Sequence, residues 1–179
     1  NKQFLGRGEF TLPFGDYEVN ITVPSDHVVA ATGECQNYGS ILTAEQKKRL
    51  EQARKSDSPV IIVTQAEAEK AEGDKSKKTK TWTYKATNVR DFAFATSRKF
   101  IWDAQNMPVN GKNVLCMSYY PKEGNPLWER YSTKLVAHTI KTYSKYTVDY
   151  PYPVAISVHS KWIGMEYPMI CFNGGRPEA

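Results

Sequence analysis

The chain has 179 residues, of which 40% are hydrophobic and 12% aromatic, a composition that supports a packed core and excludes an intrinsically disordered protein. No apolar run approaches the roughly 18–20 residues needed to span a bilayer, so no membrane span is expected. Lys and Arg number 24 and Asp and Glu 19, which gives a mildly basic formal charge of +5. The sequence does not begin with Met, and we expect it to be a piece of a longer polypeptide.

The densest basic stretch lies between Lys75 and Lys80, in a segment (73–80) that we interpret as a charged loop. An acidic run from Glu67 to Asp74 precedes it, so the charges cancel locally, and no aromatic residue is interleaved for base stacking. The pattern indicates a solvated loop, and we expect no nucleic-acid partner.

The chain begins with β structure. The segment 9–14 and the alternating segment 17–23 both predict strands, and Gly15-Asp16 between them has the composition of a turn. A short apolar strand follows at 28–32, and Gly33 closes it.

A helical insertion comes next. Thr43 and Thr64 each begin a capping-box pattern, in which a hydroxyl residue is followed three positions later by Gln or Glu. The first pattern predicts a helix to about Lys55, and the second predicts a helix that ends near Gly73. Between them, 59–63 is an apolar, β-branched strand.

Strong strand signals resume after the charged loop. Trp82, Tyr84 and Ala86 alternate with polar residues and should share one buried face. Further strands are predicted at 92–95, 99–104 and 113–120. Seven or so strands at short spacing predict a mainly β (α+β) fold, as an antiparallel β-sandwich or a large curved sheet with a helical insertion.

The pattern becomes helical after Pro121. Asn125 is a candidate N-cap with Pro126 at the first helical position, and apolar residues then recur every fourth position over about 20 residues. We expect this stripe to lack partners within the chain; it consists of Leu127, Tyr131, Leu135, Thr139 and Tyr143.

Two proline residues, Pro151 and Pro153, end the helix, and strands are predicted at 154–158 and 168–172. The change in pattern divides the chain into a β-rich part, 1–121, and the start of an α/β unit, 122–179.

The residue types and their spacing, taken alone, indicate no catalytic site. His27, His138 and His159 are far apart in sequence, there is no H-E-x-x-H motif, and there is no phosphate-binding glycine loop. The three cysteines are too few and too widely spaced for a disulfide framework, and we expect buried thiols; they are Cys35, Cys116 and Cys171.

Several passages, in this order, resemble a known family. They read FGDYEVNITVP at 14–24, VVAATGE at 28–34, VRDFAFA at 89–95, DYPYP at 149–153 and GMEYP at 164–168. Together they resemble the zinc aminopeptidases of the aminopeptidase N type, within the gluzincin metallopeptidases, and the wording is similar to that of bacterial members. The resemblance covers nearly the whole chain apart from the insertion and the lysine-rich loop.

The resemblance implies that 1–121 is the later part of a saddle-type N-terminal β domain and that 122–179 begins a thermolysin-like catalytic domain. It implies a parent enzyme, bacterial and exported by analogy, that removes N-terminal residues from peptides with a zinc ion. In the family the zinc ligands follow the substrate-anchoring motif, so they would lie beyond Ala179. This chain should therefore hold no metal and no catalytic residue, and should be inactive without the remainder of the catalytic domain.

The family's anchoring motif, G-A-M-E-N, is matched here by residues 163–167. The resemblance places Glu166 at the carboxylate that binds the free α-amine of the substrate, with Gly164, Met165 and Tyr167 beside it. Such a pairing fixes the register, so that only the first residue is presented for cleavage. Ile163 and Tyr167 depart from the family's Gly and Asn, and Ile163 would crowd a close backbone approach.

A second interpretation remains open. The β-rich body would also suit a non-catalytic β-sandwich module that binds peptides or glycans through exposed aromatic residues such as Trp82 or Trp102.

Overall fold

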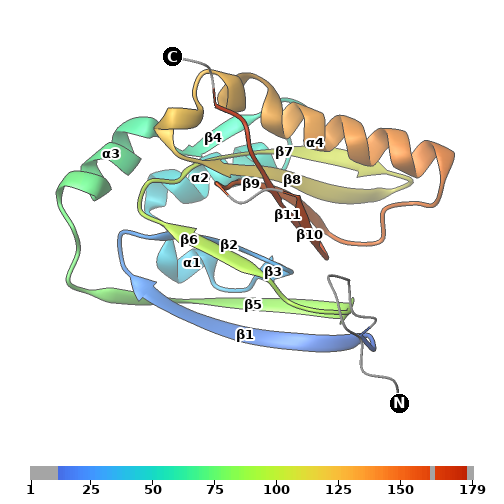
Figure 1. Cartoon of the computed structure of the whole chain (residues 1–179), viewed down its shortest axis with the longest axis horizontal. Helices are drawn as coiled ribbons and strands as arrows, with labels where there is room; N and C mark the ends of the chain where they lie inside the picture. The colour runs from blue at the N-terminus through green and yellow to red at the C-terminus, as the bar shows by residue number, and fades with distance from the viewer. Residues whose placement is uncertain (1–11, 162–163, 177–179) are drawn as a thin grey trace.

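The computed structural model describes residues 12–161 and 164–176 and shows an α+β fold built on three open sheets (Figure 1). The predicted fold class is thereby confirmed. Half of the predicted strand 9–14 lies outside the described residues, and Leu12 to Phe14 are not in a strand. Within the described part of the chain, no helix has both the length and the apolar character that a membrane crossing requires.

Two small sheets form the lower part of the molecule in Figure 1. The first has the order β1 (Gly15–Pro24), β5 (Thr79–Val89), β3 (Glu34–Cys35), and the second pairs β2 (Val28–Ala31) with β6 (Phe94–Ser97).

The turn predicted at Gly15-Asp16 is wrong, because β1 already begins at Gly15. Gly15 pairs with Val89 on β5, and the Asp16 carboxylate accepts the backbone N–H of Asn88 where the register shifts. These contacts extend the ladder to the end of the strand, so the polar pair is used for pairing instead of for a turn.

The large sheet is mixed. Its order is β10 (Met165–Tyr167), β11 (Ile170–Asn173), β9 (Val154–His159), β8 (Lys112–Tyr120), β7 (Ile101–Val109), β4 (Val60–Val63). Strands β8, β9 and β11 run parallel, whereas the pairs β4–β7, β7–β8 and β10–β11 are antiparallel. The large sheet continues across residue 121, because β8 lies before this position and β9 lies after it. The domain division near residue 121 stays a prediction.

Aromatic side chains fill the core between the small sheets and the large sheet. Trp102 stacks on Tyr119 with ring centroids 5.3 Å apart, and the ring centroid of Tyr38 lies 5.6 Å from that of Trp102. From the opposite sheet, Trp82 and Tyr84 face this cluster, and both are buried together with Ala86, as their alternation predicted.

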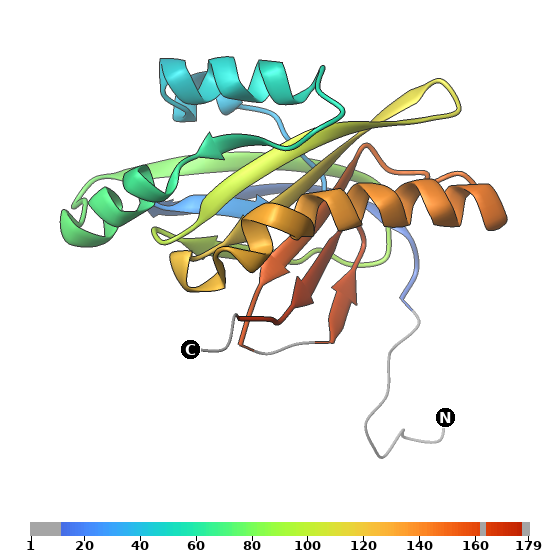
Figure 2. The ribbon, with the colours of Figure 1, turned by 90° about the horizontal axis from the view of Figure 1, so that it is seen from above.

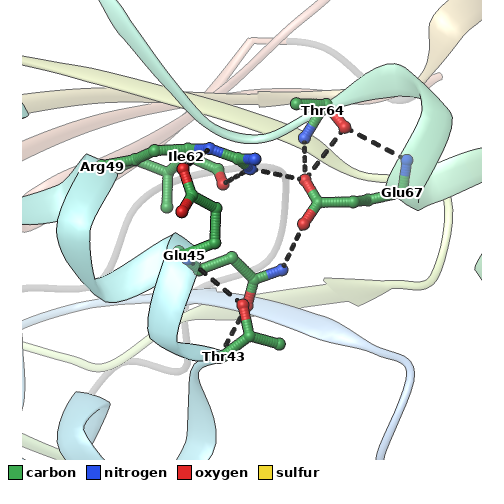
Figure 3. A network of polar contacts seen from close by, with 7 residues as sticks. Thr43, Glu45, Arg49, Ile62, Thr64 and Glu67 are labelled. Atoms are coloured by element: carbon green, nitrogen blue, oxygen red, sulfur yellow. Dashed lines mark hydrogen bonds and ion pairs between the residues drawn. The ribbon is translucent and has the colours of Figure 1, made fainter.

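The insertion forms α1 (Tyr38–Ile41), α2 (Ala44–Ala53) and α3 (Gln65–Gly73), and both predicted capping boxes are present (Figure 3). Glu67 closes the second box by accepting the N–H of Thr64 at 2.8 Å, and it also accepts from Arg49 of α2 at 2.8 Å. The Gln46 amide of the first box also donates to Glu67 at 3.3 Å, so the two capping boxes are joined directly.

The long helix α4 (Leu127–Tyr146) lies along the face of the large sheet that is turned away from the small sheets (Figures 1 and 2). Its N-cap is Pro126, so the prediction for Asn125 is wrong: the Asn125 amide donates to Gln65 and Glu129 instead of capping the helix.

The helix rests on the sheet through Trp128, Thr133, Ala137 and Ile140. The predicted stripe is exposed, with Tyr131 at 53% and Leu135 at 60%, which confirms that it has few partners within the described chain.

Candidate functional site

The predicted anchor Glu166 lies at the centre of β10, at one edge of the large sheet. It is opposite Cys171 of β11, its side chain is exposed, and among the described residues it has no ion-pair partner. Among the described strands β10 has a neighbour on one side only, so its other backbone edge is available there for pairing with an extended segment.

Gly164 leads into this strand with a φ of +84°, in the left-handed region that favours glycine. A Cβ there would meet nothing within 4 Å, so the backbone conformation, and not lack of space, accounts for the glycine. Ile163 lies outside the described residues, and its predicted crowding is therefore not described.

The remaining predicted site residues flank Glu166. Met165 is 49% exposed, and Tyr167 packs edge-on against Phe172 with ring centroids 6.1 Å apart. Tyr167 also lines a groove of about 610 Å³ between α4 and the strands β9 and β11, whereas Glu166 does not.

The groove is mainly apolar. Leu127, Tyr131 and Leu135 form its α4 wall, and Tyr150 and Tyr152 contribute from the segment before β9. Among the described residues that line it, polar groups such as the Ser132 hydroxyl are few, and there is no carboxylate, histidine or lysine. Chemically, this lining suits an apolar segment.

No three potential metal ligands among residues 12–161 and 164–176 lie together, so this part of the chain does not fit a zinc site. The histidines occupy separate elements. His27 lies within 3.0 Å of the Thr96 hydroxyl, His138 bonds Thr142 on the exposed side of α4, and His159 packs against Trp128.

The cysteines are free thiols, one buried and two half-buried. Burial raises the pKa of Cys35 to about 11 and that of Cys116 to about 12, so neither is a thiolate at neutral pH. Burial also raises the pKa of Cys171. Because Cys35 and Cys171 are half-buried, the expectation of buried thiols is confirmed for Cys116 alone.

Sequence reasoning missed Asp103, a carboxyl that is 1% exposed in the middle of the large sheet. The Tyr120 hydroxyl donates to its Oδ2 at 2.6 Å, and the Thr133 hydroxyl of α4 donates to its Oδ1. Burial raises the pKa of Asp103 to about 6 even though both hydrogen bonds act to lower it. The available signal was an Asp between Trp102 and Ala104 inside the predicted strand 99–104.

Trp82 and Trp102 are both 0% exposed. They cannot supply the exposed aromatic surface on which the interpretation as a binding module depended.

Together the fold and the candidate site describe an α+β protein with a mixed sheet, an edge strand that carries an exposed carboxylate, and an adjacent apolar groove. No protein-family model and no curated protein matches the chain.

Solved structures of M1 zinc metallopeptidases do match its fold. One from Deinococcus radiodurans has a TM-score of 0.56 and 13% identity, with 96% of this chain and 32% of that chain covered. A mutant two-domain M1 zinc metallopeptidase bound to L-arginine gives the same values. A D. radiodurans mutant bound to a Tyr-Ser-Ala substrate has a TM-score of 0.54 and 13% identity, over 93% and 32% of the two chains.

The chain thus spans about a third of the length of these structures. At this level of identity the likeness shows the fold.

Proposed function

We propose that the chain is part of a bacterial zinc metallo-aminopeptidase and contributes the strand that holds the free amine of a peptide substrate. Glu166 carries the proposal: it is an exposed carboxylate without an ion-pair partner among the described residues, on a strand with an open edge. The fold shared with M1 zinc metallopeptidases supports it, since some of those structures hold an amino acid or a peptide.

The chemistry follows from the geometry of an edge strand. An extended peptide adds to such an edge through main-chain hydrogen bonds, and a carboxylate at the end of the added strand pairs with an α-ammonium group. This arrangement fixes which peptide bond is presented. Residues outside the described part of the chain would hold the zinc, and the remainder of the catalytic domain would be the partner that completes the site.

The test uses the longer polypeptide encoded with this chain. In it, Glu166→Gln should lower kcat/KM for aminoacyl reporter amides by about 10–100-fold, because a charge-assisted hydrogen bond contributes about 1.5–3 kcal/mol. Zinc content, measured by atomic absorption, should stay unchanged.

A matched control is Glu51→Gln, which changes an exposed carboxylate on α2, a helix that packs on β4 at the edge of the large sheet opposite β10. Unchanged kinetics in Glu166→Gln would remove this residue from the site. An inactive, zinc-loaded parent would refute the aminopeptidase assignment itself.

A further inference from the structure

Asp103 joins three elements of the fold. It lies on β7, and its two carboxyl oxygens are bonded separately, one by Tyr120 of β8 and the other by Thr133 of α4. Thr133 is itself only 2% exposed, so the contact between helix and sheet is closed to water at this point. The packing contact between α4 and the sheet therefore includes a buried carboxyl group.

No cation compensates this carboxyl among the described residues. Glu129 of α4 adds a negative charge that acts in the same direction as burial, and β8 presents the Tyr120 hydroxyl. On the other side, β4 places Ile61 opposite Asp103, and α3 contributes Ala68 to the surrounding apolar cluster. An ionised Asp103 would thus be stabilised by two hydroxyl groups alone.

A chain of hydroxyl groups connects Asp103 to the groove. The Thr133 oxygen lies 2.7 Å from the Ser118 oxygen, which lies 2.8 Å from that of Ser132, and Ser132 lines the groove. Each hydroxyl has one proton to donate. When Asp103 is ionised, Ser132, Ser118 and Thr133 can each donate inward; when it is protonated, each can donate outward.

We infer that Asp103 is a proton-controlled latch for α4: the helix packs more stably on the sheet when the carboxyl is protonated, and loss of the proton weakens this packing. The proton leaves along the hydroxyl chain, each oxygen accepting one proton and passing on its own, and Ser132 releases one to water in the groove. No bond other than O–H is formed or broken. A consequence is that Ser132 offers the groove a donor at low pH and an acceptor at high pH.

The direction of the pH effect on α4 packing follows from the direction in which the pKa of Asp103 is shifted. Burial raises the pKa of Asp103 from 3.8 to about 6, so the folded state holds a proton that the unfolded state has released. The stabilisation is complete below about pH 4, and it decreases as the pH rises toward 6. The opening equilibrium constant of α4 should therefore increase by up to tenfold per pH unit in this window, and by about 100-fold in total.

The experiment is amide hydrogen exchange of α4 in the 179-residue chain between pH 4.5 and 7.5, corrected for intrinsic exchange. Wild type should lose about 25-fold protection over residues 133–140 between these pH values, because part of the total change falls below pH 4.5. The variant Asp103→Asn, which keeps the shape and stays neutral, should show little pH dependence. Asp57→Asn, which alters an exposed carboxyl, should behave as wild type.

Equal pH dependence in wild type and Asp103→Asn would overturn the inference. If that variant does not fold, the ¹³C carboxyl resonance of Asp103 in wild type decides the question. A titration midpoint near pH 6 supports the latch, and a midpoint below about pH 4.5 refutes it.

Discussion

Replacing Glu67 should test how strongly the insertion is held together, because this one carboxylate accepts hydrogen bonds both from α2 and from the N-cap residue of α3 (Figure 3). In Glu67→Ala, the N–H and hydroxyl of Thr64 lose their acceptor, and the guanidinium of Arg49 loses an ion pair of 2.8 Å. Loss of a capping interaction costs about 1 kcal/mol, and this ion pair, with a third of the Glu67 side chain exposed, adds about 0.5–1 kcal/mol. We predict a total of about 2 kcal/mol.

Urea unfolding followed by tryptophan fluorescence would measure this loss, with an unchanged m-value as the sign of an intact fold. Glu51→Ala is the control, since Glu51 is on the same insertion, 67% exposed, and forms only a 3.6 Å ion pair with Arg54. Its expected cost is below about 0.5 kcal/mol. Equal costs for the two variants would refute the structural reasoning.

The same carboxylate gives a pH dependence. Burial acts to raise the pKa of Glu67, but hydrogen bonds from Thr64 and Arg49 outweigh it, and the pKa is lowered. A carboxyl with a lowered folded pKa stabilises the fold above its unfolded pKa and loses that contribution as the pH falls. Wild type should therefore lose more stability than Glu67→Gln below about pH 4.5.

Three further substitutions probe the packing. Gly33→Ala should destabilise by more than about 3 kcal/mol, because φ is +94° and the new Cβ would overlap the Lys85 carbonyl; a cost under 1 kcal/mol in thermal unfolding would contradict this. Trp128→Ala should cost about 3–5 kcal/mol, since the ring is 4% exposed and its N–H donates to Gly175 at 2.7 Å. Burial lowers the pKa of His159, so His159→Gln should reduce the loss of stability as the pH falls through about 6.5; an unchanged pH profile would contradict this.

Local patterns in the sequence predicted local structure well. Both capping boxes depend on residues three positions apart, and the buried face of Trp82 and Tyr84 depends on alternation within one strand. The prediction for Asn125 failed in part because one of its two partners, Gln65, lies 60 residues away in sequence.

The parallel pairing of β8 with β9 could not be predicted from periodicity, because it depends on how α4 crosses over the sheet. Asp103 was missed for the same reason. Its environment comes from Thr133 and Tyr120, which lie 30 and 17 residues away in the chain.

For Glu166, the structure describes an exposed edge position, while the role as an amine anchor stays a prediction. The sequence suggested that role only through resemblance to a family.

The continuity of the large sheet also bears on how the chain could be cut or recombined. Strand β9 takes its register from β8, with Leu115 opposite Val154 and Tyr119 opposite Val158. A polypeptide that started at residue 122 would carry α4 and β9 without the hairpin on which both are assembled. The edge strand with Glu166 would then lack the sheet to which it belongs. A hybrid protein joined near residue 121 would therefore need a hairpin of matching shape in its N-terminal part.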